Sequence, residues 1–252
     1  MTHAGKTAVV TGGASGIGLA TVERLARLGV TVALNHLPDD PAGPEQAARL
    51  RAEGFAVLSA PGDVSDAASI ETMMAEALRR LGRLDILVNN AGTPATKAPI
   101  APAELEAMTD AFWDRIIATN LLGPFRCTSA AAPALRQAKG AVVNTASIAG
   151  FTALGSSIAY GASKAGLINM TVNLARALAP ECRVNAVAPG AVDTPWQKDW
   201  PESRRKAAAE KALLKRRCTA DDIAEAIVFL ATTGSPITGQ TLVVDAGLTL
   251  AP

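Results

Sequence analysis

A tyrosine and a lysine four positions apart are the residues of this sequence best suited to acid–base chemistry. Tyr160 is the only tyrosine among the 252 residues, and Lys164 follows it in the run YGASK. On a helix, positions i and i+4 share one face, so the phenol and the ammonium would point the same way. A nearby positive charge lowers the pKa of a phenol from about 10, which makes it a usable proton donor near neutral pH. By itself, the pair also fits an ordinary helix with one half-buried and one solvated side chain.

A glycine-rich turn near the N-terminus is suited to binding a diphosphate. The apolar, β-branched run at 6–11 indicates a buried strand, and an amphipathic pattern up to Leu28, closed by Gly29, indicates a helix. Between them the sequence reads GGASGIG at 12–18. Glycines allow the backbone to approach a diphosphate closely, and the free N–H groups of a helix N-terminus favour the anion. An ordinary tight turn between a strand and a helix is the alternative.

Strands and helices alternate along the rest of the chain. Apolar runs predict further strands at 30–35, 55–60, 84–88, 141–146, 183–188 and 241–245, and amphipathic patterns predict helices between them, among them 158–178. This alternation predicts an α/β fold: a doubly wound, Rossmann-type parallel sheet of about seven strands with helices on both faces, forming a single domain over 1–252. Ligands bind such sheets beyond the carboxyl ends of the strands, so the residues that follow each strand are the functional candidates.

Composition narrows the possible functions. The net charge of +1 gives no electrostatic reason to expect binding to nucleic acid or a membrane surface, and no apolar run is long enough to span a bilayer. Cys127, Cys182 and Cys218 are far apart, which argues against a disulfide framework or a metal site. With only His3 and His36, a Ser-His-Asp hydrolase is disfavoured. We expect a cytoplasmic protein without a bound metal.

The assembled motifs resemble those of the classical short-chain dehydrogenases/reductases over essentially the whole chain. They are TGGASGIG at 11–18, Asp63-Val64, NNAG at 89–92, Asn120, Ser147, YxxxK at 160–164 and PGxVxT at 189–194. They follow the family's order, and the 13 positions from Ser147 to Tyr160 are the family's separation. The resemblance implies an NAD(P)-dependent oxidoreductase that interconverts a carbonyl compound and an alcohol.

The resemblance implies a role for each matching residue. Tyr160 would be the general acid/base, Ser147 would orient the substrate carbonyl, and Lys164 would bind the nicotinamide ribose and lower the pKa of Tyr160. Asn120, at a helix bend, would hold a water that relays protons to Lys164. The implied cofactor-binding residues are Gly12, Ser15, Gly16, Ile17, Gly18, Asn35, His36, Asp63, Val64, Asn90, Ala91, Gly92, Tyr160, Lys164, Pro189, Gly190, Val192 and Thr194. Asn89 would be structural.

Cofactor preference depends on the end of the second predicted strand. NAD-preferring relatives carry an acid there, which binds the ribose hydroxyls and repels a 2′-phosphate. Here the strand ends in Asn35-His36-Leu37, with no acid, so NADP(H) is favoured over NAD(H). The basic residue that many NADP-binding relatives carry in the glycine loop is replaced by Ser15.

The substrate is the least determined part of the prediction. The candidate pocket residues are Pro94, Thr96, Phe151, Leu154, Trp196 and Trp200, which are mostly apolar. The basic stretch 204–206 has the character of a solvated helix face, and no cation is evidently directed at a substrate carboxylate. We therefore expect a neutral, hydrophobic ketone or secondary alcohol, with a polyol or an acyl thioester as alternatives. The long, proline-rich connection from Gly92 to Asn120 is either a flap over the site or an insertion without catalytic meaning.

One rival function comes from another class of protein. A non-catalytic dinucleotide sensor or regulator would keep the fold but would have no need of Ser147, Tyr160 and Lys164, all of which are present. The resemblance also suggests assembly as a homotetramer or homodimer through the long helices and the last strand.

Overall fold

The computed structural model describes residues 3–197 and 200–251. Its main sheet has seven parallel strands in the order β3-β2-β1-β4-β5-β6-β9. The strands are β1 (Thr7–Val10), β2 (Thr31–His36), β3 (Val57–Pro61), β4 (Ile86–Asn89), β5 (Ala141–Thr145), β6 (Arg183–Pro189) and β9 (Thr241–Val244). A separate pair joins β7 (Val192–Asp193) to β8 (Cys218–Thr219). The predicted α/β class and all seven predicted strands are confirmed, with ends that differ by at most two residues.

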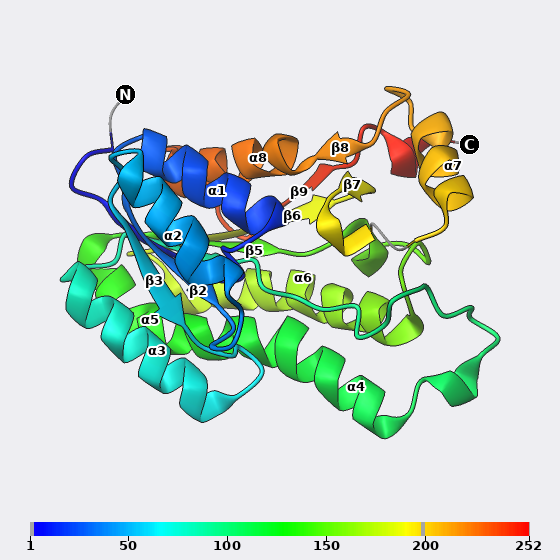
Figure 1. The fold of residues 1–252 in the computed structure, drawn as a ribbon, viewed down its shortest axis with the longest axis horizontal. Coiled ribbons are helices and arrows are strands. Elements are labelled where there is room, and N and C mark those ends of the chain that lie inside the picture. The colour runs from blue at the N-terminus through cyan, green and yellow to red at the C-terminus, as the bar shows by residue number, and fades with distance from the viewer. Residues whose placement is uncertain (1–2, 198–199, 252) are drawn as a thin grey trace.

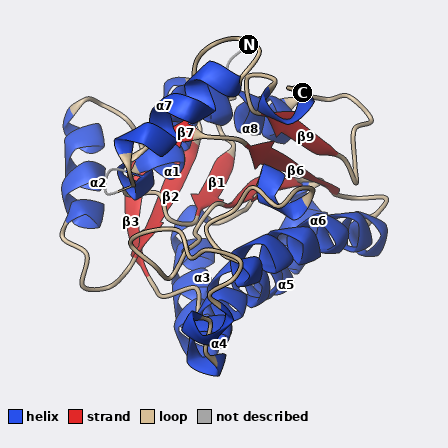
Figure 2. Ribbon diagram, turned by 90° about the vertical axis from the view of Figure 1, so that its right-hand side faces the viewer, coloured by secondary structure: helices blue, strands red, loops and turns tan. Residues whose placement is uncertain are grey.

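Helices cover both faces of the sheet (Figures 1 and 2). They are α1 (Gly16–Arg27), α2 (Ala42–Ala52), α3 (Ala67–Leu81), α4 (Asp110–Ile117), α5 (Gly123–Ala138), α6 (Ile158–Leu178), α7 (Glu202–Lys211) and α8 (Ala220–Thr232). Short 3₁₀ turns lie at η1 (Leu105–Ala107), η3 (Ile148–Gly150), η4 (Pro195–Gln197) and η5 (Leu248–Leu250), and a π-helical turn, η2 (Ala118–Leu122), joins α4 to α5. In the described residues no helix is both long and apolar enough to cross a bilayer.

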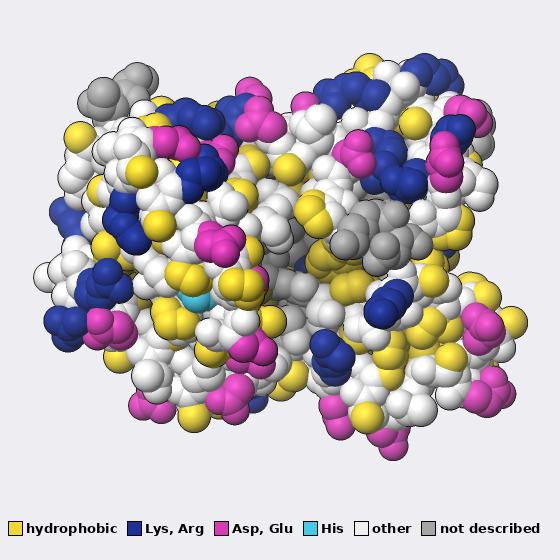
Figure 3. All heavy atoms as spheres, viewed as in Figure 1, with side chains coloured by type: hydrophobic (Ala, Val, Ile, Leu, Met, Phe, Trp, Pro, Cys, Tyr) yellow, Lys and Arg dark blue, Asp and Glu magenta, His cyan; other side chains and the backbone are white. Residues whose placement is uncertain are grey.

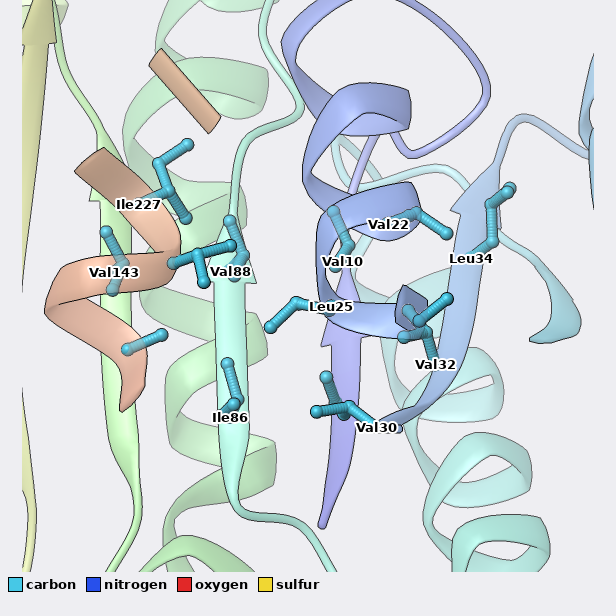
Figure 4. Packing of buried hydrophobic residues seen from close by; sticks show 14 of the residues in the cluster. Val10, Val22, Leu25, Val30, Val32, Leu34, Ile86, Val88, Val143 and Ile227 are labelled. Atoms are coloured by element: carbon cyan, nitrogen blue, oxygen red, sulfur yellow. The ribbon is translucent and has the colours of Figure 1, made fainter. Parts of the chain in front are cut away.

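Alternate residues of each central strand supply two separate cores. Val10 faces α1, beside Val22 and Leu25, in a cluster that also includes Ile227 of α8 and Val143 (Figure 4). Its neighbour Val9 faces the other way, into a second cluster built with α3, α5 and α6. Successive side chains of a strand point to opposite faces, so a strand buried on both sides is apolar throughout, as the run at 6–11 had predicted.

The strand order reverses between β1 and β4: β2 and β3 follow β1 on one side of the sheet, and β4, β5, β6 and β9 lie on the other. Chain connections leave in opposite directions at that point, which opens a crevice above the carboxyl ends of the strands. A cleft of about 1530 Å³ lies there, lined by residues that follow β1, β2, β3, β4, β5 and β6. On the face shown in Figure 3, it appears as a hollow between the left and right parts of the molecule. Drug-sized ligands fill roughly 300–1,000 Å³, so this volume can hold a dinucleotide together with a substrate.

Candidate active site

Two helix-capping interactions position the acid–base residues. Ser157 caps α6, and its hydroxyl accepts a hydrogen bond from the Tyr160 N–H at 3.1 Å, which fixes where the helix begins. Tyr160 therefore lies in the first turn and Lys164 in the next, on the side facing the cleft. Ser147 lies two residues after the end of β5 and caps η3, where its Oγ accepts from the Ala149 N–H at 3.1 Å. All three predicted residues line the cleft.

Lys164 is buried among groups that provide no negative charge. Its Nζ donates a hydrogen bond to the Thr145 carbonyl oxygen at 2.7 Å and lies 5.8 Å from the centroid of the Tyr160 ring. Burial disfavours the ammonium and lowers the pKa of Lys164 to about 8. The side chain is thus held at the junction between the β5 strand end and the phenol.

The pKa of Tyr160 differs from the expectation for a phenol next to an ammonium. Loss of water around its hydroxyl raises the pKa to about 12, and a hydrogen bond with Ser147 opposes this rise only in part. For the chain alone, burial therefore outweighs any effect of Lys164 on the pKa of Tyr160. The lowered pKa that the sequence predicted is wrong for this state. The phenol stays protonated at neutral pH.

Asn120 lies in the π-helical turn η2, between α4 and α5. Such turns often occur at functional sites because they interrupt regular backbone bonding. The Asn120 Oδ1 accepts from the Thr93 N–H at 2.8 Å, while Nδ2 donates to Thr93 O and Ser163 Oγ. A Cβ on Gly92 would lie 3.3 Å from this Oδ1 and 3.6 Å from the Lys164 Nζ. The residue is fully buried behind the cleft wall, and its role in a water relay stays a prediction.

The glycine loop is held in shape by the strand end beside it. Asn90 Nδ2 donates to the carbonyl oxygens of Thr11 and Gly12, at 3.1 and 3.2 Å. A Cβ on Gly18 would lie 2.0 Å from the Gly12 oxygen, and Gly12 itself has a φ of +61° with Ala91 packed against it. Side chains are excluded at both positions. Asn89 is structural, as predicted, since its Nδ2 bonds to Thr128 and Asn144.

The N-terminus of α1 is open toward the cleft. Ser15 occupies its cap position without a side-chain hydrogen bond to the helix, which leaves N–H groups of the first turn free. Gly12, Ser15, Gly16 and Ile17 line the cleft beside it. Free N–H groups and the helix dipole favour an anion at this place, so the geometry fits the diphosphate of a dinucleotide.

The end of β2 differs from the prediction at Asn35. Its Oδ1 accepts from the Gly12 N–H at 3.1 Å, and its Nδ2 donates to the carbonyls of Ala60 and Gly62. With its side chain used to tie the glycine loop to β3, Asn35 does not line the cleft. His36 does, but its two ring nitrogens already bond to Leu37 O and Ser59 Oγ, at 2.7 and 2.8 Å.

Most other predicted cofactor residues lie in the cleft wall. They are Asp63, Val64, Asn90, Ala91, Gly92, Pro189, Gly190, Val192 and Thr194. The Asp63 carboxylate accepts from the backbone and hydroxyl of Ser65, which fixes the turn after β3. Gly18 is the exception, because it supports the loop from behind rather than lining the cleft.

The predicted substrate residues divide into two groups. Phe151, Leu154, Trp196 and Trp200 line the cleft, and the Trp196 ring meets the Tyr160 ring edge-on with centroids 6.0 Å apart. Pro94 and Thr96 do not line it. The Ile100 N–H bonds to Ser156 O at 2.8 Å, which draws residues 99–102 to the wall in their place.

The sequence analysis missed a group of cations at the same end of the cleft. Arg115 of α4 and Arg204, Arg205 and Lys211 of α7 line it. The expectation of a solvated basic face fits Arg204, which is exposed although it lines the cleft, but not Arg205, which is partly buried. Positions 204, 208 and 211, which line the cleft, have the spacing of one side of a helix, and this spacing could have indicated that they share a face. Nothing in the sequence indicated what that face would contact.

Comparison with known proteins identifies the family. A family model described as enoyl-(acyl carrier protein) reductase matches residues 12–249. The chain is 38% identical over 248 residues to cis-4-hydroxycyclohexanecarboxylate dehydrogenase of Sinomonas cyclohexanicum, covering 97% of this chain and 96% of the relative. It is 36% identical over 251 residues to 3-oxoacyl-(acyl-carrier-protein) reductase FabG of Thermotoga maritima, covering 98% of each.

Solved structures agree with these relatives. A gluconate 5-dehydrogenase from Burkholderia cenocepacia, solved with NADP and tartrate, superposes with a TM-score of 0.90 at 30% identity, covering 100% of this chain and 98% of that one. The chain belongs to the short-chain dehydrogenase/reductase family. It is thereby an oxidoreductase of a family that uses nicotinamide cofactors.

Proposed function

We propose that this protein transfers a hydride between NAD(P)(H) and a substrate that alternates between a carbonyl and a secondary alcohol. One observation carries the proposal: Tyr160, Ser147 and Lys164, whose Nζ is 5.8 Å from the Tyr160 ring centroid, lie in the wall of the same cleft as the glycine loop. The three reported relatives are named for alcohol or carbonyl compounds, which supports the reaction class.

The residues divide the proton chemistry between them. The bound nicotinamide would supply or accept the hydride. Tyr160 would donate its proton to the carbonyl oxygen during reduction and take one back during oxidation. Ser147 would hydrogen-bond that oxygen as negative charge develops on it. The Lys164 ammonium, the predominant form below a pH of about 8, would stabilise the phenolate left behind. Asn120 would hold the relay water behind them.

NADP(H) stays the favoured cofactor, because no acid ends β2, but we expect the preference to be weak. A 2′-phosphate needs a cation, and the described cleft residues next to β2 offer only His36, Leu37 and Asp40. The His36 ring is engaged by two hydrogen bonds, and Asp40 carries a negative charge. Neither the acid that selects NAD(H) at the strand end nor a cation that selects NADP(H) is present there.

The test is a panel of ketones and alcohols followed by nicotinamide absorbance with each cofactor, using the wild type and Tyr160→Phe. We expect Tyr160→Phe to lower kcat by about 10²–10⁴-fold, since it removes the proton donor. Cofactor binding, read as the rise in melting temperature with NADPH, should persist in the variant and show that its fold is intact. Unchanged turnover by Tyr160→Phe would disprove the catalytic assignment. Cofactor binding without turnover of any substrate would favour the sensor.

We also propose that the chain works in the cytoplasm as a homotetramer or homodimer. Large apolar side chains are exposed on the long helices and the last strand: Phe125 on α5, Val172 on α6, Phe229 on α8, and Leu242 and Val243 on β9. β9 is also an edge strand of the main sheet, open to further pairing. Light scattering during gel filtration should give two or four times the 25.8 kDa chain mass. Val243→Asp should reduce it, and a monomer in the wild type would refute the proposal.

A further inference from the structure

Charged side chains are divided between the two ends of the cleft. Its acidic wall residues are Asp40 and Asp63, after β2 and β3. Four cations, Arg115, Arg204, Arg205 and Lys211, line it from α4 and α7, and no acidic residue lines it from those helices within the described chain. Figure 3 shows basic side chains along the right-hand rim of the hollow. With a net charge of only +1, composition alone does not produce this concentration of positive charge.

Arg204 is fixed across the mouth of the cleft. Its Nη2 donates to the Gly155 carbonyl oxygen at 3.0 Å, and its guanidinium lies 4.9 Å from the centroid of the Trp200 ring. These contacts connect α7 to the loop that carries Phe151 and Leu154. Burial lowers the pKa of Arg204, and in the described part of the chain no carboxylate forms an ion pair with it. A neutral carbonyl partner leaves most of its charge uncompensated.

Arg205 has still fewer partners. Its Nε is buried and has no hydrogen-bond acceptor among the described residues, and the same holds for Nε1 of Trp200, another residue of the cleft wall. Buried donors are nearly always satisfied, so two unpaired donors in one wall indicate a ligand with acceptor atoms. The neighbouring Lys206 behaves differently: it pairs with Glu202 at 2.8 Å and does not line the cleft. Only part of α7 is therefore an ordinary solvated surface.

We propose that the substrate carries a carboxylate, which Arg205 binds at the α7 end of the cleft while the carbonyl or alcohol group lies at Tyr160. This inference rests on the proposed function and specifies its substrate class: keto acids and hydroxy acids with an apolar part between the two groups. A planar guanidinium can bind both carboxylate oxygens at once. Phe151, Leu154 and Trp196 provide apolar wall in the same cleft, and the Trp196 ring meets that of Tyr160. A substrate with a carboxylate thereby replaces, in this proposal, the neutral substrate that we expected from the sequence.

Paired substrates test the proposal with nothing changed but the charge. We would measure reduction of 4-oxocyclohexanecarboxylate and of its methyl ester by the wild type, Arg205→Gln, Arg205→Lys and Lys206→Gln. The wild type should prefer the acid at least tenfold in kcat/KM. Arg205→Gln should raise KM for the acid at least tenfold, with less than a threefold change in kcat or in either constant for the ester. Arg205→Lys should restore part of the loss, and Lys206→Gln, the matched control, should resemble the wild type.

A binding measurement keeps the inference separate from the proposed activity. Cyclohexanecarboxylate, added with NADPH, should raise the melting temperature of the wild type and of Lys206→Gln but not of Arg205→Gln, and cyclohexanecarboxamide should have no effect. Turnover that depends on Tyr160 but is equal for acid and ester would overturn the carboxylate site and leave the oxidoreductase assignment intact. Stronger turnover of acetoacetyl-coenzyme A than of any keto acid would also overturn it. Carboxylate binding without turnover of any substrate would instead contradict the proposed function.

Discussion

The two ends of the cleft are built in different ways. The cofactor end consists of turns directly after strands, where backbone groups of the glycine loop and the Asn90 side chain hold one another. The substrate end brings together residues from η3, α4, η4 and α7, which lie up to about a hundred positions apart. The first end can be recognised from local sequence patterns, whereas the second depends on how distant segments pack.

Lys164 lies where the two ends meet, and its replacement should have the largest effect. Lys164→Met should lower kcat by about a thousandfold, because the phenolate loses its stabilising charge. The same change should raise the free energy of unfolding at pH 7 by about 1–3 kcal/mol, since a buried amine with a depressed pKa opposes folding. Activity assays and urea unfolding would measure both effects.

The pH dependence provides the control for this variant. The pKa of Lys164 is about 8 in the folded protein, against 10.5 for the ordinary side chain. The free-energy cost of burying its ammonium is therefore complete below pH 8 and disappears as the pH rises toward 10.5. The stability advantage of Lys164→Met should therefore fall to less than half of its pH 7 value at about pH 9.5. An advantage independent of pH would show that burial of the charge is not its cause.

Gly18→Ala should disable the cofactor end alone. Its Cβ would lie 2.0 Å from the Gly12 oxygen, so the glycine loop must move, and we expect cofactor affinity to fall about a hundredfold, or by 2.7 kcal/mol. Titration of NADPH against intrinsic fluorescence measures this. Gly234→Ala is the matched control, because a Cβ there meets nothing within 4 Å. Normal affinity in Gly18→Ala would mean that the loop tolerates displacement.

Leu37→Arg should reduce the contrast in charge between the two ends. Leu37 is exposed and lines the cleft directly after β2, where a 2′-phosphate lacks a cation. The new guanidinium should raise kcat/KM for NADP(H) relative to NAD(H) by about tenfold. Leu105→Arg, another exposed leucine that does not line the cleft, controls for the added charge. An unchanged ratio would place the 2′-position away from residue 37.

Asp40→Asn should give the smallest effect. The Asp40 Oδ1 accepts from the Ala42 N–H at 3.0 Å at the start of α2, and asparagine can keep this bond while losing the charge. Removing one like charge from the β2 end should improve KM for NADP(H) about threefold and leave KM for NAD(H) unchanged. Equal improvement for both cofactors would point to a change in loop structure instead.

Local patterns in the sequence determined most of the fold and the cofactor end. Apolar runs followed by glycine, and the caps Ser147 and Ser157, act within a few residues of where they occur in the chain. They therefore predict strands, turns and the start of α6 without knowledge of the rest. Tyr160, Lys164 and Ser147 were predicted from spacing and family resemblance, and the structure brings all three to one cleft.

Only the tertiary structure decided what surrounds these residues. Burial sets the pKa of Tyr160 above and that of Lys164 below its usual value, and burial depends on the whole fold. Asn35 was assigned to the cofactor because its position matched, but packing against β1 and β3 engages its side chain. Arg205 has the sequence context of a solvated helix. The placement of α7 beside η3 makes it part of the cleft, because side chains from distant segments acquire a function only where folding brings them together.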